Sequence, residues 1–169
     1  MAKGNVKATK LSVGLPFGLG QLEFEPDEVQ QYAAWELYVE LTTRVALHPL
    51  SPEEGFIREA LSSLYNIIHV TRNILREAGP SIAQGPNSLG PVAINVITKG
   101  IRPFLSKWHP ILFEYEQERS REIDQLEHER IWGKAPQFYQ ELDDLQEQML
   151  VYVEALAKIA GINMGIENS

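Results

Sequence analysis

The stretch FYQELDDLQEQMLVYVEALAKI, residues 138–159, decides the fold of this chain. Hydrophobic residues recur in it at alternating intervals of four and three: Phe138, Leu142, Leu145, Met149, Tyr152, Leu156 and Ile159. This repeat is typical of a helix whose apolar seam packs against neighbouring helices. It predicts a helix over 136–160 inside an intramolecular bundle. Self-association through the same seam is the alternative, because dimeric coiled coils use the same spacing.

Two further helices are predicted upstream of this seam by their start and stop signals. Pro26 and Asp27 open a helix that we expect to run to about His48. Ser51, followed by the Pro-Glu-Glu of 52–54, has the form of a capping box and opens a helix that we expect to end near Ala78.

The next part of the chain is rich in helix-breaking residues. Residues 79–91 carry enough Gly and Pro to predict a long loop. A third helical region follows over 91–119, with interruptions expected at Gly100, Pro103 and Pro110. A further acidic helical stretch is predicted over 120–132.

Residues 6–25 alternate polar and apolar residues on both sides of a Gly/Pro-rich centre, which predicts a β-hairpin. Its apolar face would carry Leu11, Val13, Leu22 and Phe24 and pack on the helices or on another chain. The glycines at 14, 18 and 20 are not followed by Gly-Lys-Ser/Thr, so they do not form a phosphate-binding loop of that kind.

Together these signals predict a mainly α protein: an antiparallel bundle of four to five helices with a short N-terminal β-hairpin. The length of 169 residues fits a single domain over 1–169, with the hairpin at 6–25 and the bundle at 27–160.

Composition narrows the function classes. The chain has no cysteine, which excludes disulfides, zinc ribbons and thiol nucleophiles and favours a cytoplasmic location. No stretch is long and apolar enough to predict a membrane span. The net charge of −8 argues against broad binding to nucleic acid. No metal-binding or cofactor motif is found, so no metal or cofactor is expected.

Charge is distributed unevenly along the chain. Residues 58–107 contain six basic side chains against two acidic ones, whereas residues 114–147 contain eleven acidic against four basic. Solvated faces or internal complementarity between neighbouring helices would explain this pattern. A local anion site is the alternative.

The basic residues of 58–107 include two groups that can form such a site. Tyr65, His69, Arg72 and Arg76 follow one another at intervals of four, three and four, so they share one stripe of a helix. Arg102, Lys107 and His109 lie on the next helical region, which can pack antiparallel to the first and face this stripe. Guanidinium groups beside aromatic rings suit a phosphate or carboxylate ligand. A solvated helix face is the structural alternative.

The second of these groups belongs to the segment RPFLSKWHP, residues 102–110. Its Arg-x6-His spacing resembles the signature of HEPN-type ribonucleases, which are helical bundles in which Arg and His from two subunits act on RNA without metal. The resemblance implies that Arg102 and His109 are catalytic in a dimer. Pro103 stands where that family usually has a polar residue. The structural alternative is a helix bent at its prolines that buries Phe104, Leu105 and Trp108.

The sequence therefore favours a non-catalytic adaptor, regulatory or ligand-sensing subunit that acts through a protein interface or self-association. A small anionic ligand would be held by Tyr65, His69, Arg72, Arg76, Arg102 and Lys107. The alternative is a metal-independent HEPN-like ribonuclease. The hairpin and the 79–91 loop are the parts we expect a protein partner to touch.

Overall fold

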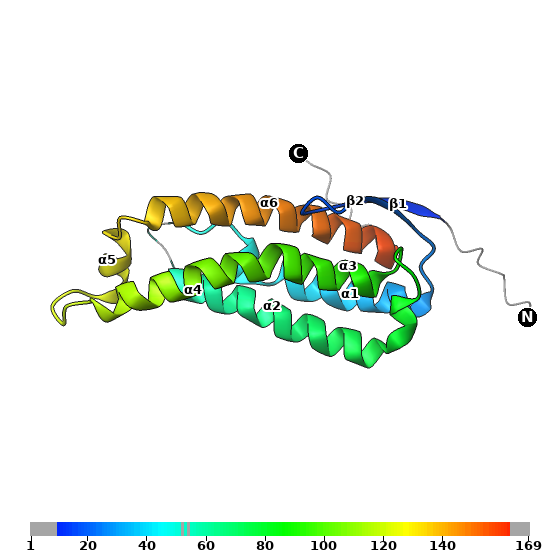
Figure 1. Ribbon diagram of the computed structural model, residues 1–169, viewed down its shortest axis with the longest axis horizontal. Helices are drawn as coiled ribbons and strands as arrows, with labels where there is room; N and C mark the ends of the chain where they lie inside the picture. The colour runs from blue at the N-terminus through cyan, green and yellow to red at the C-terminus, as the bar shows by residue number, and fades with distance from the viewer. Residues whose placement is uncertain (1–9, 52, 54, 163–169) are drawn as a thin grey trace, which may run out of the picture.

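The computed structural model describes residues 10–51, 53 and 55–162 and shows a mainly helical bundle with an N-terminal two-stranded hairpin (Figure 1). The long rods of the bundle lie side by side, and short α5 lies at one end. The helices are α1 (Glu28–Thr42), α2 (Ile57–Ala78), α3 (Leu89–Val96), α4 (Arg102–Gln117), α5 (Gln125–Arg130) and α6 (Ala135–Ala160). The predicted fold class is confirmed. No helix within the described ranges is long and apolar enough to cross a membrane.

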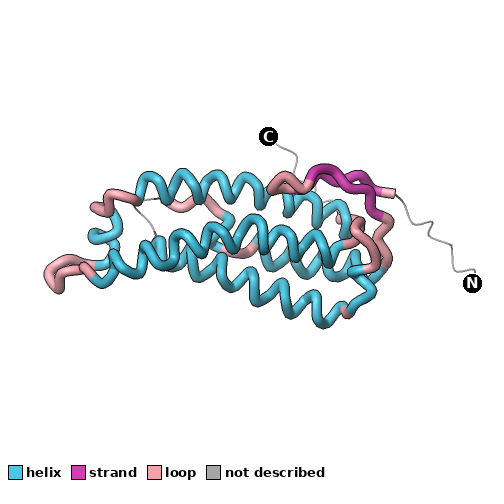
Figure 2. Tube along the Cα trace, viewed as in Figure 1, coloured by secondary structure: helices cyan, strands magenta, loops and turns pink. Residues whose placement is uncertain are grey.

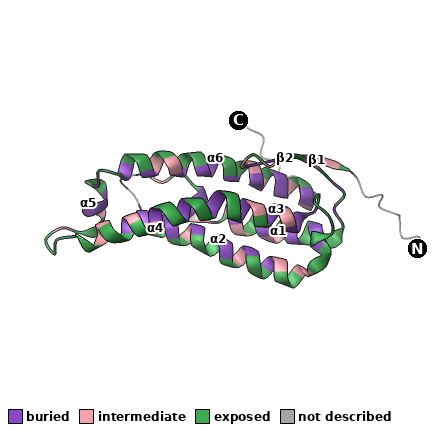
Figure 3. Cartoon of the chain, in the orientation of Figure 1, coloured by how far each residue is buried: buried purple, intermediate pink, exposed green. Residues whose placement is uncertain are grey.

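The apolar seam of α6 forms the centre of the core. All seven of its residues are buried, and Leu145 is the most exposed at 6%. The seam packs mainly on α1 and on the first strand of the hairpin. Figure 3 shows the buried sides of the helices turned toward one another, as a bundle core requires. The seam is therefore used inside the chain, which confirms the intramolecular interpretation.

The hairpin lies against the same helix, at the end of the bundle away from α5 (Figure 2). Strands β1 (Leu11–Leu15) and β2 (Gly20–Phe24) pair antiparallel, with Val13 opposite Leu22. Val13 and Phe24 are completely buried. The predicted packing of the apolar face on the helices is confirmed, while positions 6–9 of the prediction lie outside the described residues.

The turn of the hairpin is anchored to two helical segments. Phe17 has a positive φ of 56°, and its N–H donates to the side-chain Oε1 of Gln148 on α6 at 2.9 Å. The Phe17 ring lies directly on Gly100, where any side chain would overlap it. This contact connects the N-terminal hairpin to the middle of the α3–α4 rod.

The expected interruptions in 91–119 are replaced by one continuous rod. A π-helical segment, Ile97–Ile101, joins α3 to α4, and the N–H of Arg102 donates to the carbonyl of Ile97, five residues back. This wider turn comes immediately before Pro103, which has no N–H to donate and occupies the first turn of α4. Pro110 lies within α4 without ending it. The predicted 79–91 loop is also partly helical, because a 3-10 helix covers Pro80–Ala83 and α3 starts at Leu89.

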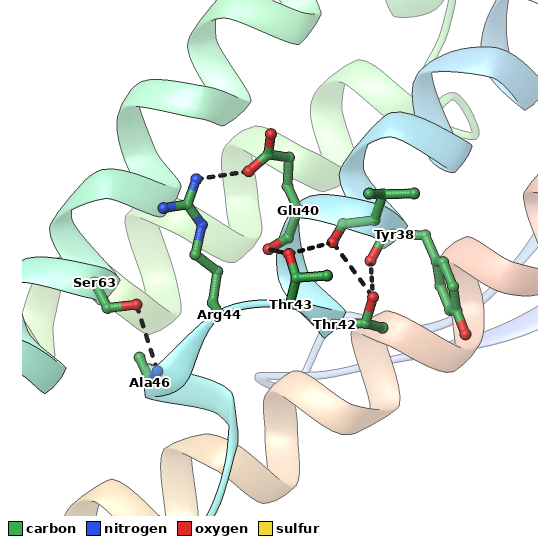
Figure 4. Close-up of polar contacts among 8 residues, drawn as sticks. Tyr38, Glu40, Thr42, Thr43, Arg44, Ala46 and Ser63 are labelled. Atoms are coloured by element: carbon green, nitrogen blue, oxygen red, sulfur yellow. Dashed lines mark hydrogen bonds and ion pairs between the residues drawn. The ribbon is translucent and has the colours of Figure 1, made fainter. Parts of the chain in front are cut away.

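The first helix ends earlier than predicted, at Thr42 (Figure 4). The hydroxyl of Thr42 donates to the carbonyl of Tyr38 at 2.8 Å, and that of Thr43 donates to the carbonyl of Val39 at 2.8 Å. These hydroxyl groups compete with backbone N–H groups for the carbonyls four residues back, at the end of the helix. A 3-10 helix, Val45–Leu47, then turns the chain, so the predicted end at His48 is wrong.

The second helix begins later than predicted, at Ile57. The Ser51 hydroxyl accepts from the N–H of Glu53 in a turn, and Gly55 has a φ of 77° that a helix cannot contain. The Ile57 N–H instead donates to Oε2 of Glu129, at 3.0 Å, from α5. A distant carboxylate thus replaces the local capping box. That helix, α5, is itself shorter than the predicted 120–132 stretch.

Glu129 gives the bundle a pH-dependent component of stability. It is 2% exposed, and burial raises the pKa of its carboxyl, against the lowering effect of the Ile57 and Arg58 N–H groups. Because the folded state then holds a proton that the unfolded state has lost, this group destabilises the fold as pH rises above about 4.5. Glu129→Gln cannot titrate, so the variant lacks this loss of stability. Its free energy of unfolding, measured by urea titration, should rise relative to that of the wild type as the pH increases above about 4.5. Glu127→Gln on the exposed side of α5 is the matched control, and equal profiles for both variants would contradict the assignment.

The contact between Phe17 and Gly100 makes a second prediction about stability. Gly100→Ala should lower the free energy of unfolding by about 1–3 kcal/mol, because the added methyl group overpacks the site. Urea denaturation measures this loss. Gly133→Ala is the matched control, since a Cβ there meets no atom within 4 Å. The loss at Gly100 should become smaller in a Phe17→Ala background, and simple additivity would argue against the contact.

Candidate functional site

The predicted stripe on α2 is present and faces solvent. Its members, Tyr65, His69, Arg72 and Arg76, are all exposed, Tyr65 at 53%. Buried Leu61, Leu64, Ile67 and Ile68 supply the core contacts of the same helix. The Tyr65 and His69 rings meet edge to face with centroids 5.9 Å apart.

The segment RPFLSKWHP turns its side chains in three directions. Phe104, Leu105 and Trp108 are buried, as the structural alternative predicted. Lys107 points toward α6, where its Nζ lies 2.5 Å from Oε1 of Glu141. His109 points toward α2, where its ring meets that of Tyr65 edge to face at 6.5 Å.

The contact between α2 and α4 is organised by Arg58. Its guanidinium donates from Nε and Nη2 to the two carboxylate oxygens of Glu116, at 2.9 and 2.8 Å. Its Nη1 lies 2.9 Å from Nδ1 of His109. A guanidinium can only donate, so Nδ1 is the acceptor and the neutral ring carries its proton on Nε2.

These contacts fix the antiparallel register of the two helices. Arg58 lies opposite Glu116, and Tyr65, seven residues further along α2, lies opposite His109, seven residues back along α4. Seven residues are two helical turns, about 10.5 Å of rise. Continued for two further helical turns, the same register would bring Arg72 to the level of Arg102.

Arg72 and Arg102 are both exposed, and neither makes an ion pair or a side-chain hydrogen bond with another residue of the described part of the chain. We call the surface formed by Tyr65, His69, Arg72, Arg76 and Arg102 the α2/α4 basic face. Arg76 lies one turn further along α2 and donates to the side chain of Asn73. The face thus offers guanidinium groups with aromatic rings beside them.

Lys107 does not belong to this face, so the expectation that it faces the α2 stripe is wrong. Its charge is compensated by Glu141, whose pKa is lowered chiefly by the hydrogen bond from Lys107. The Glu141 carboxylate also accepts from the indole N–H of Trp108 at 2.9 Å. Because Trp108 is buried, it directs the neighbouring lysine toward α6.

Sequence reasoning missed Arg58 and Glu116 as parts of the site. The signal was available, because Arg58, Tyr65 and Arg72 are spaced by seven, as are Arg102, His109 and Glu116. Two matched series of this kind indicate two antiparallel helices in contact along those positions. The pairing of the series, however, depends on which helices are neighbours.

The described residues contain no group of three or more His, Asp or Glu side chains arranged to hold a metal ion. Asp124 caps α5 by accepting from the N–H of Glu127 at 2.8 Å. His128 stacks on the Tyr115 ring at 3.9 Å and contacts the Tyr115 carbonyl through Nε2 at 2.8 Å. These groups therefore hold α5 against α4.

No family model, curated protein or solved structure matches this chain. The function is therefore inferred from the geometry of the α2/α4 basic face.

The Arg58 contacts lead to a prediction that nuclear magnetic resonance can check. In the wild type, the ¹⁵N shifts of His109 should indicate a neutral ring protonated on Nε2. Arg58→Ala should remove this preference and leave the His69 signals nearly unchanged. A His109 ring protonated on Nδ1 in the wild type would contradict the described contact.

The Arg58–Glu116 pair can be tested separately by a double-mutant cycle. It should give a coupling free energy of about 1 kcal/mol, because the pair is bidentate but partly exposed.

Proposed function

We propose that this protein is a non-catalytic regulatory subunit that senses a phosphate-bearing ligand on its α2/α4 basic face. The proposal is carried by the register of α2 and α4, which, continued for two further turns, brings Arg72 and Arg102 to one level, and neither arginine has an ion pair within the described part of the chain. The registers of Arg58 with Glu116 and of Tyr65 with His109 support this placement.

The electrostatics of the face favour an anion. Two guanidinium groups that lie side by side on adjacent helices repel each other. The Glu116 carboxylate cannot compensate them, because it is paired with Arg58 about four helical turns away. A phosphate group can accept bidentate hydrogen bonds from both arginines and remove this repulsion. The ligand would then join α2 to α4 at a second point.

The aromatic residues favour a ligand that is larger than phosphate alone. Tyr65 is half exposed, and its ring makes edge-to-face contacts with the rings of His69 and His109. A planar base can pack on these rings while its phosphates reach Arg72 and Arg102. We therefore propose a nucleotide as the ligand class, in preference to inorganic phosphate.

A ligand that bridges α2 and α4 acts on stability rather than on a chemical step. Binding to the folded state alone raises the free energy of unfolding by RT ln(1 + [L]/Kd). The bound state would present a more rigid surface to a protein partner, which gives the bundle its regulatory role.

Thermal unfolding in the presence of ligands tests this proposal. At about 100 times Kd, a nucleotide should add about 2.7 kcal/mol to the free energy of unfolding. This corresponds to a rise in Tm of roughly 5–10 °C for a chain of this size. Arg72→Ala and Arg102→Ala should abolish the rise, while Lys107→Ala should retain it, because Lys107 faces α6. A flat response to nucleotides, pyrophosphate and phosphate would overturn the proposal.

The ribonuclease alternative would assign catalysis to Arg102 and His109. In the structure, Nδ1 of His109 is already engaged by the guanidinium of Arg58, which favours a structural role for this ring. Incubation of the protein with RNA in a chelator tests this alternative directly. Cleavage that disappears in a folded His109→Ala variant would replace the sensor proposal with the enzyme.

A further inference from the structure

A second surface lies on α1, on a different side of α2 from the basic face. The outward side of α1 exposes a row of large apolar residues: Val29, Tyr32, Trp35 and Val39, at 40%, 65%, 40% and 38%. The row runs along the helix for about 15 Å. We call these four residues the α1 outer row.

The composition of α1 shows that this row is unusual for a surface helix. Apolar residues are spread around the whole helix, and Ala33, Ala34, Leu37 and Leu41 already fill the side that packs in the bundle. Polar residues, among them Gln31, Glu36 and Glu40, are interspersed with them. The apolar side chains of the α1 outer row therefore lie outside the packed side of the helix and are exposed to solvent.

A groove with acidic walls lies beside this row. The groove, of about 640 Å³, runs between the start of α1 and the end of α2 and is lined by Glu28, Val29, Tyr32, Ala33, Glu36, Glu77 and Ala78. None of its three carboxylates makes an ion pair within the described part of the chain. By contrast, Glu40 at the other end of α1 is paired with Arg44 (Figure 4).

The negative charges of the carboxylates in the groove repel one another. Burial, followed by the charges of Glu77 and Glu40, raises the pKa of Glu36. A cation placed in the groove would relieve this repulsion, and the Tyr32 ring offers a face on which such a cation can lie.

We propose that the α1 outer row and the adjoining groove are the docking site for a basic amphipathic helix of a partner protein. Its apolar stripe covers Val29, Tyr32, Trp35 and Val39, while its lysines or arginines reach Glu28, Glu36 and Glu77. A helix laid in a groove beside another helix is a common mode of recognition. The surface is independent of the nucleotide proposal, because it uses the α1 side of α2.

Charge argues against a second copy of this chain as the occupant. A two-fold dimer formed through this face would bring the same acidic groups of both copies together. The net charge of −8 adds to that repulsion. A basic partner helix has the opposite charge and the matching apolar surface.

Fluorescence of Trp35 provides a local measurement of docking. Of the three tryptophans, Trp35 is 40% exposed, while Trp108 and Trp132 are 1% and 6% exposed. The test titrates the full chain with a synthetic helix of about 14 residues, four turns long, that carries leucines on one side and lysines on the other. A twin peptide with glutamates in place of the lysines is the probe control.

The lysine peptide should bind, protect Trp35 from acrylamide and bind at least tenfold more tightly than the glutamate peptide. Its affinity should fall with added salt, because the carboxylates are solvent-accessible. Glu36→Lys combined with Glu77→Lys should reverse the preference for the two peptides, whereas Glu147→Lys combined with Glu154→Lys on α6 should preserve it. Tyr32→Ser should weaken binding about tenfold.

Three results would overturn the proposal. The first is the absence of binding by the lysine peptide at low salt. The second is equal binding by the Glu36/Glu77 and Glu147/Glu154 variants, which would show general charge attraction. The third is a dimer by sedimentation that dissociates in Tyr32→Ser, which would assign the face to a second copy.

Discussion

The burial of the α6 seam is the constraint on which the rest of this molecule depends. The hairpin and α1 both pack on it, so two segments near the N-terminus are positioned by a helix near the C-terminus. The remaining core follows from this arrangement, because α2 packs on α1 and the α3–α4 rod packs on α2. Each helix is thereby given one buried side and one free side. The free sides carry both candidate surfaces.

Buried polar side chains connect the ends of these elements. Gln30 of α1 accepts from the N–H of Leu89 at the start of α3, and Glu129 of α5 accepts from that of Ile57 at the start of α2. Gln146 of α6 donates to the carbonyls of Ala46 and His48 at 2.8 and 2.9 Å. Each bond satisfies a backbone group at a place where local capping is absent. The helix ends are thus specified by contacts between residues far apart in sequence.

The two candidate surfaces lie on different sides of α2 and have opposite charge. Toward α4, the Arg58 contacts set the register from which the proposed level of Arg72 and Arg102 follows. Toward α1, Glu77 joins Glu36 beside exposed apolar residues. Arg76 and Glu77 are adjacent in sequence, yet they belong to different surfaces because successive helical residues point about 100° apart.

Local periodicity by itself determined the α6 seam, the hairpin and the α2 stripe, because each depends only on residues within a few positions of one another. The start of α2 at Ile57 depends on Glu129, and the close contact at Gly100 depends on Phe17. No local pattern contains either partner. The same is true of the site: spacing placed Arg72 and Arg102 on their helices, but pairing with Glu141 removed Lys107 from the face. Which charges meet was decided by the tertiary structure, since a charged side chain interacts with whichever partner folding brings within reach.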